Sequence, residues 1–486
     1  MTIGQDTMIK PGDVMIDEIT LQSHTGFKMS LKGIFESITI YEDMFSNVMS
    51  GSISLINSYN IVKNFPIIGA ETLTISYRTP MIGSEPVKLV FRTYKISLLS
   101  ETLQESNQLV RVEFISHEAI KSMQKKISKS YKNMPVSRMV GNIYDEYLAK
   151  DNGEMNGILN STVEGKSGYN LDNGYTKNSV GSVAESIGTV FNSSEDETAD
   201  GKRHIKTIIE TYDFRSYVIP YMTPFQAINW LCHRSRAKVN TSMCDYVFFE
   251  NQEGHHFVPI SWLKTQPTSY TYTNYPEGFR NQDSERMLES ELRNVHSMTV
   301  HSISDKIKQQ TLGLFASALM THDLTTKMWN TVQYRYDYSF TNDAAHLEKN
   351  PLVPLAKLDY TDAVESSICF YPNSSFTSSG MARINDPDEI YLLRQSLLNQ
   401  INSVNLIVEC HGDSNVMVGQ VIDFKTISKE STTMQDRFDD DYLQGRYLIT
   451  ALKHTITDRE HSMVMTLSRD SFAEPVAEVK GKELKV

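Results

Sequence analysis

Apolar and polar residues alternate over several short stretches near the N-terminus, which predicts β-strands. In the run TLTISYR, residues 72–78, the Leu, Ile and Tyr positions fall on one side and the Ser, Thr and Arg positions on the other. Residues 52–55 alternate in the same way. This pattern indicates half-buried strands of an antiparallel sheet, with a polar side that faces a partner or a wet channel. An ordinary sandwich strand pair explains the segment equally well.

Further strands follow before residue 116. The apolar alternation that begins at Val87 changes phase between Phe91 and Tyr94, which predicts a β-bulge. Residues 110–114 alternate again. About five strands separated by turn signals favour a small barrel or sandwich.

Four stretches carry helical signals. Ser116 is a candidate N-cap for a helix with apolar positions as far as Ile127, and a second apolar stripe starts just after Pro135. Thr223, Pro224 and Gln226 form the pattern of a capping box with Pro in the first turn. The fourth helix is expected to start at 386–389 and to reach residue 401.

The remaining chain divides into strands and polar segments. Residues 245–251 and 255–260 predict a hairpin around Gly254. Residues 150–201 predict an exposed loop or linker, and 347–380 an irregular insertion. The later strands are expected at 297–304, 404–410, 421–425, 447–455 and 463–468.

One layout occurs twice. The order strand, loop, strand runs over residues 53–75 and again over 406–424, and each copy has a later strand with a polar end, at 114–117 and 467–470. The loop holds an Asn and then a Gly in both copies, namely Asn60 and Gly69 in the first and Asn415 and Gly419 in the second. We interpret this as two copies of one barrel, with a coincidence between two β-meanders as the rival explanation.

Composition excludes some classes of function. The 47 basic and 59 acidic residues give a net charge of -12, and no Lys and Arg cluster is interleaved with aromatics, so a nucleic-acid-binding groove is not expected. The four cysteines lie far apart and predict reduced, buried thiols. No apolar run approaches the roughly 20 residues that span a bilayer, so we expect a protein made in the cytoplasm.

No motif supports catalysis, a metal site or a cofactor. The run Gly165-Lys166-Ser167 lacks the first glycine of a phosphate-binding loop. His255 and His256 sit at a hairpin and are expected at the surface. The acidic run 436–441 either binds a hard cation or is a solvated loop, and the solvated loop is favoured. We therefore expect no enzyme activity.

The succession of segments resembles the baseplate hub proteins of contractile-tailed bacteriophages, which are related to the N-terminal part of the VgrG spike. The segments that carry the resemblance are GSISLINSYNIVKNFPIIGAETLTI, PYMTPFQAINWL followed by DYVFFEN, THDLTTK, and GRYLITALKHTI. The insertions at 150–201 and 347–380 depart from the shorter members.

The resemblance implies a homotrimer whose six similar barrels match a sixfold tail tube on one side and a threefold spike on the other. Implied partners are the central spike, the tube or tube-initiator proteins, other baseplate proteins and the tape measure. The ring would line the channel for DNA within the virion tail. Alternatives are a virion-associated wall-degrading enzyme and a VgrG-like spike component.

The expected fold class is α+β, mainly β, with two tube-like antiparallel β-barrel domains and helical and loop insertions. Pro66, Gly69, Glu71 and Gly419 are predicted to shape loops between barrel strands. The expected parts are a first barrel (1–125), helices and a polar insertion (126–200), an α+β domain (201–275), a discontinuous second barrel (276–346 and 396–473), an insertion with a capped helix (347–395) and a tail (474–486).

Overall fold

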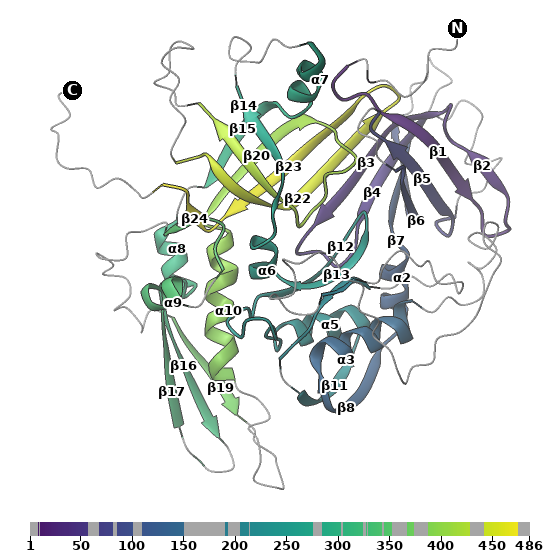
Figure 1. Cartoon of the computed structure of the whole chain (residues 1–486). Coiled ribbons are helices and arrows are strands. Elements are labelled where there is room, and N and C mark those ends of the chain that lie inside the picture. Colours follow the sequence, from purple (N-terminus) through teal and green to yellow (C-terminus); the bar gives the residue numbers. More distant parts are fainter. Residues whose placement is uncertain are drawn as a thin grey trace, which may run out of the picture.

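The computed structural model describes most of the chain. The described residues are 8, 10–56, 68–80, 85–100, 109–149, 190–192, 205–212, 214–275, 284–302, 305–323, 327, 329–342, 345–351, 367–373, 387–427 and 442–474. The expected class, α+β and mainly β, is confirmed because strands dominate and helices lie between them (Figure 1).

One large sheet of 13 strands runs through the molecule in the order β15-β20-β23-β22-β3-β4-β7-β6-β5-β1-β2, with β21 on β22 and β14 on β21. Figure 1 shows the C-terminal strands β22 and β23, in yellow, beside the N-terminal β3, in purple. The strands are β1 (Met15–Gln22), β2 (Lys28–Ser30), β3 (Phe35–Asp43), β4 (Ser50–Ile56), β5 (Thr72–Arg78), β6 (Val87–Ser100), β7 (Leu109–Ser116), β14 (Thr268–Asn274), β15 (Val295–Ser302), β20 (Val404–His411), β21 (Val421–Thr426), β22 (Gly445–Thr457) and β23 (His461–Arg469).

The two halves of this sheet share one strand order. The N-terminal half reads β3-β4-β7-β6-β5-β1 and the C-terminal half β15-β20-β23-β22-β21-β14. They differ at one end, since β1 runs antiparallel to β5 whereas β14 runs parallel to β21. Among the described strands, the pairings join the halves through β3 and β22 and close neither half into a separate barrel.

β-Bulges fall at matching places in the two halves. The ladder of β6 on β7 shifts between Thr93 and Lys95, and that of β22 on β23 shifts between Ile449 and Ala451. The first of these is the bulge that the sequence predicted near Tyr94. The outer ladders also match, because β3 shifts after Phe35 and β15 after Val295.

A central segment packs against both halves. Its strands are β8 (Ile127–Pro135), β9 (Val190–Asn192), β10 (Ile205–Ile209), β11 (Phe214–Met222), β12 (Tyr246–Asn251) and β13 (Gly254–Pro259), and its helices are α2 (His117–Gln124), α3 (Val136–Ile143), η1 (Tyr144–Leu148), α5 (Pro224–Cys232) and α6 (Ile260–Lys264). Its apolar side chains share one core with the C-terminal half, while the N-terminal half has a core of its own.

A separate three-stranded sheet has the order β17-β16-β19 and stands apart from the large sheet beside the long helix α10 (Figure 1). The remaining elements are α7 (Ser284–Leu292), α8 (Lys306–Thr311), β16 (Ala316–Asp323), β17 (Trp329–Arg335), α9 (Tyr336–Asn342), β18 (Asn350–Pro351), β19 (Ile368–Asn373), α10 (Pro387–Ile401) and β24 (Ser471–Phe472). The stretch 347–380 was expected to be irregular, yet it contributes β19, which pairs in parallel with β16.

Several local predictions are confirmed. Thr223 and Gln226 form the complete capping box of α5, and the stripe after Pro135 is buried in α3 and η1. The hairpin around Gly254 and the strands expected after residue 403 are also present. Cys232, Cys244 and Cys410 are free and buried.

Three predictions are wrong. The helix after Ser116 ends at Gln124, so Ile127 belongs to β8. The Ser and Thr side of β5 is buried like its apolar side, so β5 is not half-exposed. His255 and His256 are buried on opposite faces of β13 rather than at the surface, because the central segment and the large sheet enclose this hairpin.

Candidate functional site at the junction of the two sheet halves

The two halves meet where β3 lies antiparallel to β22. The ladder runs without a shift from Ala451 opposite Asp43 to Thr457 opposite Ser37. Alternation places Glu42 and His454 on the buried face of this ladder, with exposed fractions of 1% and 0%. The junction is therefore a continuous sheet that carries polar side chains in its core.

A hydrogen-bonded network surrounds Glu42. Its Oε2 accepts from the backbone N–H of Val418 at 3.0 Å, and its Oε1 lies 3.9 Å from Nε2 of His454. Gln252, in the turn between β12 and β13, contacts the same His454 nitrogen at 3.0 Å and donates to the carbonyl of Val416 at 3.3 Å. These contacts join β3, β22, the loop before β21 and the central segment.

Burial sets the protonation of this network. It raises the pKa of Glu42 to about 8, and the N–H of Val418 offsets only part of that effect. Burial also lowers the pKa of His454 to about 4, and it lowers that of His461 well below the ordinary value. At neutral pH all three groups are uncharged, which is the state that a closed core favours.

Other contacts tie the halves together beside the ladder. Nδ1 of His454 lies 2.9 Å from Nε2 of His461, whose ring packs edge-on against Tyr77 of β5. Thr79 and Ser414 exchange two hydrogen bonds, each from the backbone N–H of one to the hydroxyl of the other, at 3.0 and 2.9 Å. The contacts of Tyr77 with His461 and of Thr79 with Ser414 join residues of opposite halves that are more than 300 positions apart, so the junction is built into the fold.

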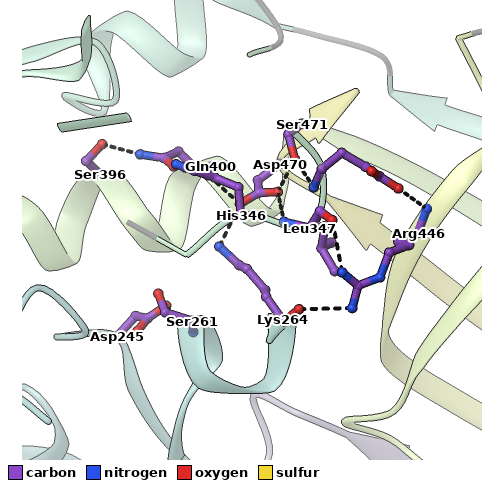
Figure 2. Close-up of polar contacts among 11 residues, drawn as sticks. Asp245, Ser261, Lys264, His346, Leu347, Ser396, Gln400, Arg446, Asp470 and Ser471 are labelled. Carbon is purple, nitrogen blue, oxygen red and sulfur yellow. Dashed lines mark hydrogen bonds and ion pairs between the residues drawn. The ribbon is translucent and has the colours of Figure 1, made fainter. Parts of the chain in front are cut away.

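A second buried polar cluster lies at the end of β23 (Figure 2). Figure 2 shows Lys264 rising from α6 toward Asp470, and its Nζ reaches Oδ2 of that carboxylate at 2.8 Å. Nδ1 of His346 contacts the same oxygen at 3.0 Å, while the N–H of Leu347 and the hydroxyl of Ser471 donate to Oδ1 at 3.2 and 2.8 Å. Lys264 and Asp470 are both 0% exposed.

The charge of Lys264 determines the state of Asp470. Burial alone would raise the pKa of this carboxyl, but the Lys264 ammonium and His346 hold it well below its ordinary value. Arg446 extends the cluster, because its guanidinium donates to the carbonyls of Leu347, Lys264 and Gln266. The cluster fastens β22 and β23 to α6.

The matching end of the N-terminal half is fastened differently. At the end of β7, the hydroxyl of Ser116 donates to Oε2 of Glu250 on β12, which also accepts from the N–H of Met49 at 2.9 Å. Burial raises the pKa of Glu250, while His255 acts in the opposite direction. Ser116 stands at the N-cap of α2 as expected, but its hydroxyl serves this contact rather than the helix.

These clusters can hold the molecule together but offer little to a substrate. Glu42, His454, Lys264 and Asp470 are 1% exposed or less, so no external molecule reaches their reactive atoms. Among the described residues, no group of three or more His, Cys, Asp or Glu side chains is placed to hold a metal ion. None of the helices in the described part of the chain is both long and apolar enough to cross a bilayer.

Three of the four residues predicted to shape loops are described: Gly69 and Glu71 precede β5, and Gly419 precedes β21. Gly69 has φ of 89°, and Glu71 is fully buried, with its carboxylate accepting from the N–H groups of Ile68 and Gly69 at 2.7 and 3.0 Å. Gly419 has φ of 94°. Both glycines therefore adopt the left-handed conformation just before matching strands. Pro66, the run 165–167 and the acidic run 436–441 lie outside the described residues.

Sequence reasoning missed the junction and cluster residues, although one signal was present. Glu42 follows Ile38 and Ile40 in the apolar phase of β3, and His454 stands between Leu452 and Ile456 in the apolar phase of β22. A polar residue in an apolar phase marks a buried group that needs a partner. Asp470 and Lys264 carry no comparable signal, because each stands at the end of an element.

Comparison with solved structures finds chains that align over most of the length of this one. A tail protein from Neisseria meningitidis MC58 matches with a TM-score of 0.46 and 9% identity, over 93% of this chain and 96% of its own. The 43 kDa tail protein of prophage MuSo2 from Shewanella oneidensis matches with a TM-score of 0.49 and 10% identity, over 94% and 99%. A type VI secretion component from E. coli matches with a TM-score of 0.36 and 9% identity, over 94% and 77%.

These structural neighbours are tail and secretion-spike proteins, the class that the sequence resemblance names. No family model matches the chain. No curated protein matches it either. Because every TM-score quoted is below 0.5, the functional proposal rests on the chain's own geometry and on the segments that carry the resemblance.

Proposed function

We propose that this chain is the structural hub of a contractile phage tail baseplate. Three copies form a ring in which six similar sheet halves alternate around a central channel. The ring joins a sixfold tail tube to a threefold central spike. In this role the chain binds other copies of itself, the spike, and tube or tube-initiator proteins, and it contacts other baseplate proteins and the tape measure in the virion.

The observation that carries the proposal is the duplicated sheet. Both halves have the same strand order and matching bulges, and β3 and β22 join them side by side. A threefold ring of such chains presents six nearly equivalent units to one neighbour while it keeps threefold symmetry toward another. An internal duplication is thus what a symmetry adaptor requires.

The buried polar groups fit a scaffold better than an enzyme. The perturbed carboxyl and imidazole groups of the junction are sealed and uncharged, and the charged pair Lys264–Asp470 is equally closed. Perturbed pKa values mark a catalytic site only where a cleft gives access to the groups. We infer that their work is to hold three parts of the chain in fixed relation. No turnover of peptidoglycan is expected.

The net charge of -12 suits a conduit for DNA, because like charge discourages the passing polymer from binding the wall. Charge-reversing substitutions of acidic residues on the inner wall are expected to slow DNA delivery. Unchanged delivery after such substitutions would remove the electrostatic part of the proposal and leave the adaptor role intact.

The test is electron-microscopic class averaging of the purified chain, both alone and after co-expression with the proteins encoded by the adjacent genes. We expect a threefold ring with a near-sixfold outline and an open centre. A compact monomer under both conditions would overturn the hub. In that case the wall-degrading alternative is tested directly, by incubating the chain with purified peptidoglycan and measuring released fragments.

A further inference from the structure

Strand β11 exposes apolar side chains on the face where a half-covered sheet normally carries polar ones. Its side chains alternate strictly between exposed and buried from Phe214 to Ile219. Phe214 and Val218 lie in the exposed phase, with exposed fractions of 67% and 68%. Antiparallel sheets with one covered face usually present polar residues to water on the other face. The outer face of β11 therefore departs from the pattern of a solvent-exposed sheet.

The buried face of the same strand holds it in place. Ile219 is 0% exposed, and Tyr217 packs edge-on against Trp230 with ring centroids 5.4 Å apart. β11 pairs antiparallel with β8, and Figure 1 shows both strands beside α3 and α5. The outer face is thus fixed in shape before a partner arrives, which lowers the entropic cost of binding.

The apolar side chains continue along the strand. Tyr221 follows a register shift in the ladder of β11 on β8 and is 73% exposed. On β8, Ser130 stands opposite Val218, so a hydroxyl group rather than a charge lies beside this apolar position. Single exposed apolar residues are common on any protein, but three large ones from one strand form a patch of the kind that marks an interaction site.

The charged residues of the two strands are all positive. β8 and β11 contain no Asp or Glu, and their basic residues are Lys129, Lys132 and Arg215. Lys129 pairs with Glu146 of η1, and Lys126, just before β8, lies 5.2 Å from the centroid of the Tyr221 ring. Among the described side chains, no carboxylate pairs with Lys126 or Lys132. The apolar patch therefore has a basic rim, in a chain whose net charge is -12.

We propose that this surface docks an acidic segment of another protein, one that places Asp or Glu side chains against the lysines and apolar side chains against the strand. The β8–β11 face, as we name it, comprises Lys126, Ser130, Lys132, Phe214, Val218 and Tyr221. Charge complementarity determines the choice of partner, since a basic rim attracts an acidic segment and apolar contacts then hold it in place. A baseplate hub has to hold other baseplate proteins, but the inference does not depend on the hub.

Two other occupants fit the β8–β11 face less well. If two copies of the chain docked through this same face, their lysines would be brought together, and like charges in contact disfavour such a pairing. An anionic bilayer is typically bound by an amphipathic helix that buries its apolar side in the lipid. The β8–β11 face instead belongs to a strand pair whose other face is packed into the core.

Selection from a random peptide display library tests the proposal on the unaltered full chain. The chain is immobilised, and the peptides that bind it are sequenced. We expect sequences enriched in Asp and Glu beside Phe, Tyr, Trp, Leu or Ile. A selected peptide that carries a benzophenone group should label residues 126–135 or 214–222 on irradiation. Because this measurement needs no substitution, it decides the case in which a variant does not fold.

Two double variants separate the contributions of the rim and the strand. Lys126→Glu/Lys132→Glu is expected to weaken binding of the selected peptide by about tenfold or more, because the attractive charges become repulsive. It should also remove the weakening of binding at about 1 M salt, where the Debye length is about 3 Å. Phe214→Ser/Val218→Thr is expected to weaken binding by about tenfold as well, but to leave the salt dependence in place.

A matched control removes the same kinds of side chain from another part of the surface. Phe27 is 65% exposed and stands beside the exposed Lys28 at the start of β2. Phe27→Ser/Lys28→Glu should leave binding of the selected peptide unchanged. A loss equal to that of the test variants would mean that the peptide is attracted to the chain as a whole, and the proposal would fail.

Other results also decide against the proposal. Selected peptides without acidic residues, or labelling outside the two strands, would overturn it. Weaker self-association of Phe214→Ser/Val218→Thr in sedimentation would assign the face to a second copy. Binding to vesicles of phosphatidylcholine and phosphatidylserine that Lys126→Glu/Lys132→Glu abolishes would assign it to a membrane. None of these measurements requires the ring, so a failure of the hub leaves the docking surface standing, and the reverse holds as well.

Discussion

The ends of β7 and β23 occupy matching positions in the two sheet halves. One end is held by a neutral hydroxyl and the other by an ion pair, so the pKa values of the two buried carboxyl groups shift in opposite directions. Ser116, at the end of β7, offers a neutral hydroxyl to the buried Glu250, whose pKa is raised by burial. Asp470, just after β23, faces the Lys264 ammonium, which brings its pKa below the ordinary value. The duplicated backbone has thus been fastened to the central segment twice, with different chemistry.

The comparison shows what duplication conserves and what it leaves free. Strand order and bulges set the path of the backbone and are shared by both halves. Side chains at the ends contact different parts of the central segment, β12 in one case and α6 in the other. The contacts of Glu250 and Asp470 are called the Glu250 anchor and the Asp470 anchor below. Because the pKa of Glu250 is raised in the fold, the Glu250 anchor adds more to the free energy of unfolding as the pH falls. The pKa of Asp470 is lowered, so the Asp470 anchor makes its full contribution above pH 3.8 and loses it only in stronger acid.

The largest expected effect comes from breaking the charged anchor. Asp470→Ala leaves the Lys264 ammonium buried without its carboxylate, and removal of one partner from a buried pair costs about 3–5 kcal/mol. The free energy of unfolding, measured by denaturant titration at pH 7, should fall by that amount.

Two further variants distinguish charge from packing. Asp423→Ala removes a half-exposed partner of Lys425 from the same sheet half and is expected to cost less than about 1 kcal/mol. Lys264→Met/Asp470→Leu removes both buried charges and should recover a large part of the loss. Equal losses for Asp470→Ala and Asp423→Ala would contradict the role assigned to the buried anchor.

A smaller, pH-dependent effect is expected at the junction. The pKa of Glu42 is about 8 in the folded chain and 4.5 in the unfolded chain. The stabilisation from its protonated form is therefore fully present below pH 4.5 and is lost as the pH rises through 8. Within this window the free energy of unfolding should fall by up to about 1.4 kcal/mol per pH unit.

Glu42→Gln is the matched control for this titration. The amide keeps the size and cannot ionise, so the variant should show a flatter profile of unfolding temperature between pH 6 and pH 9. His454 acts in the other direction, because its pKa of about 4 makes the fold lose stability as the pH drops below 6.5. Parallel profiles for the wild type and Glu42→Gln would show that Glu42 is already ionised in the fold.

Much of the fold could be predicted because local patterns decide it. The strands after residue 403 and the capping box at Thr223 depend on alternation and on side chains within a few residues. The phase change near Tyr94 located a bulge, and the repeated layout of 53–75 and 406–424 predicted two copies of one barrel; the described strands share the repeated order but form one continuous sheet.

What the patterns could not supply depends on distant contacts. The joining of the halves through β3 and β22 relates residues about 400 positions apart, and neither strand encodes its partner. The same is true of His255 and His256, whose burial follows from elements far away in the chain. Lys264 and Asp470 meet only because α6 packs against the end of β23, so the sequence could not predict this buried ion pair.

The smallest expected effect tests the neutral anchor. Ser116→Ala removes a hydroxyl whose oxygen lies within hydrogen-bond distance of both Glu250 and the carbonyl of Met49, while the Glu250 carboxyl still accepts from the N–H of Met49. Loss of such a hydrogen bond costs about 0.5–1.5 kcal/mol, well below the loss for Asp470→Ala. Denaturant titration of the two variants side by side gives the comparison. A loss for Ser116→Ala as large as that for Asp470→Ala would mean that Glu250 is charged in the fold, and that both halves are fastened by the same kind of ionic contact.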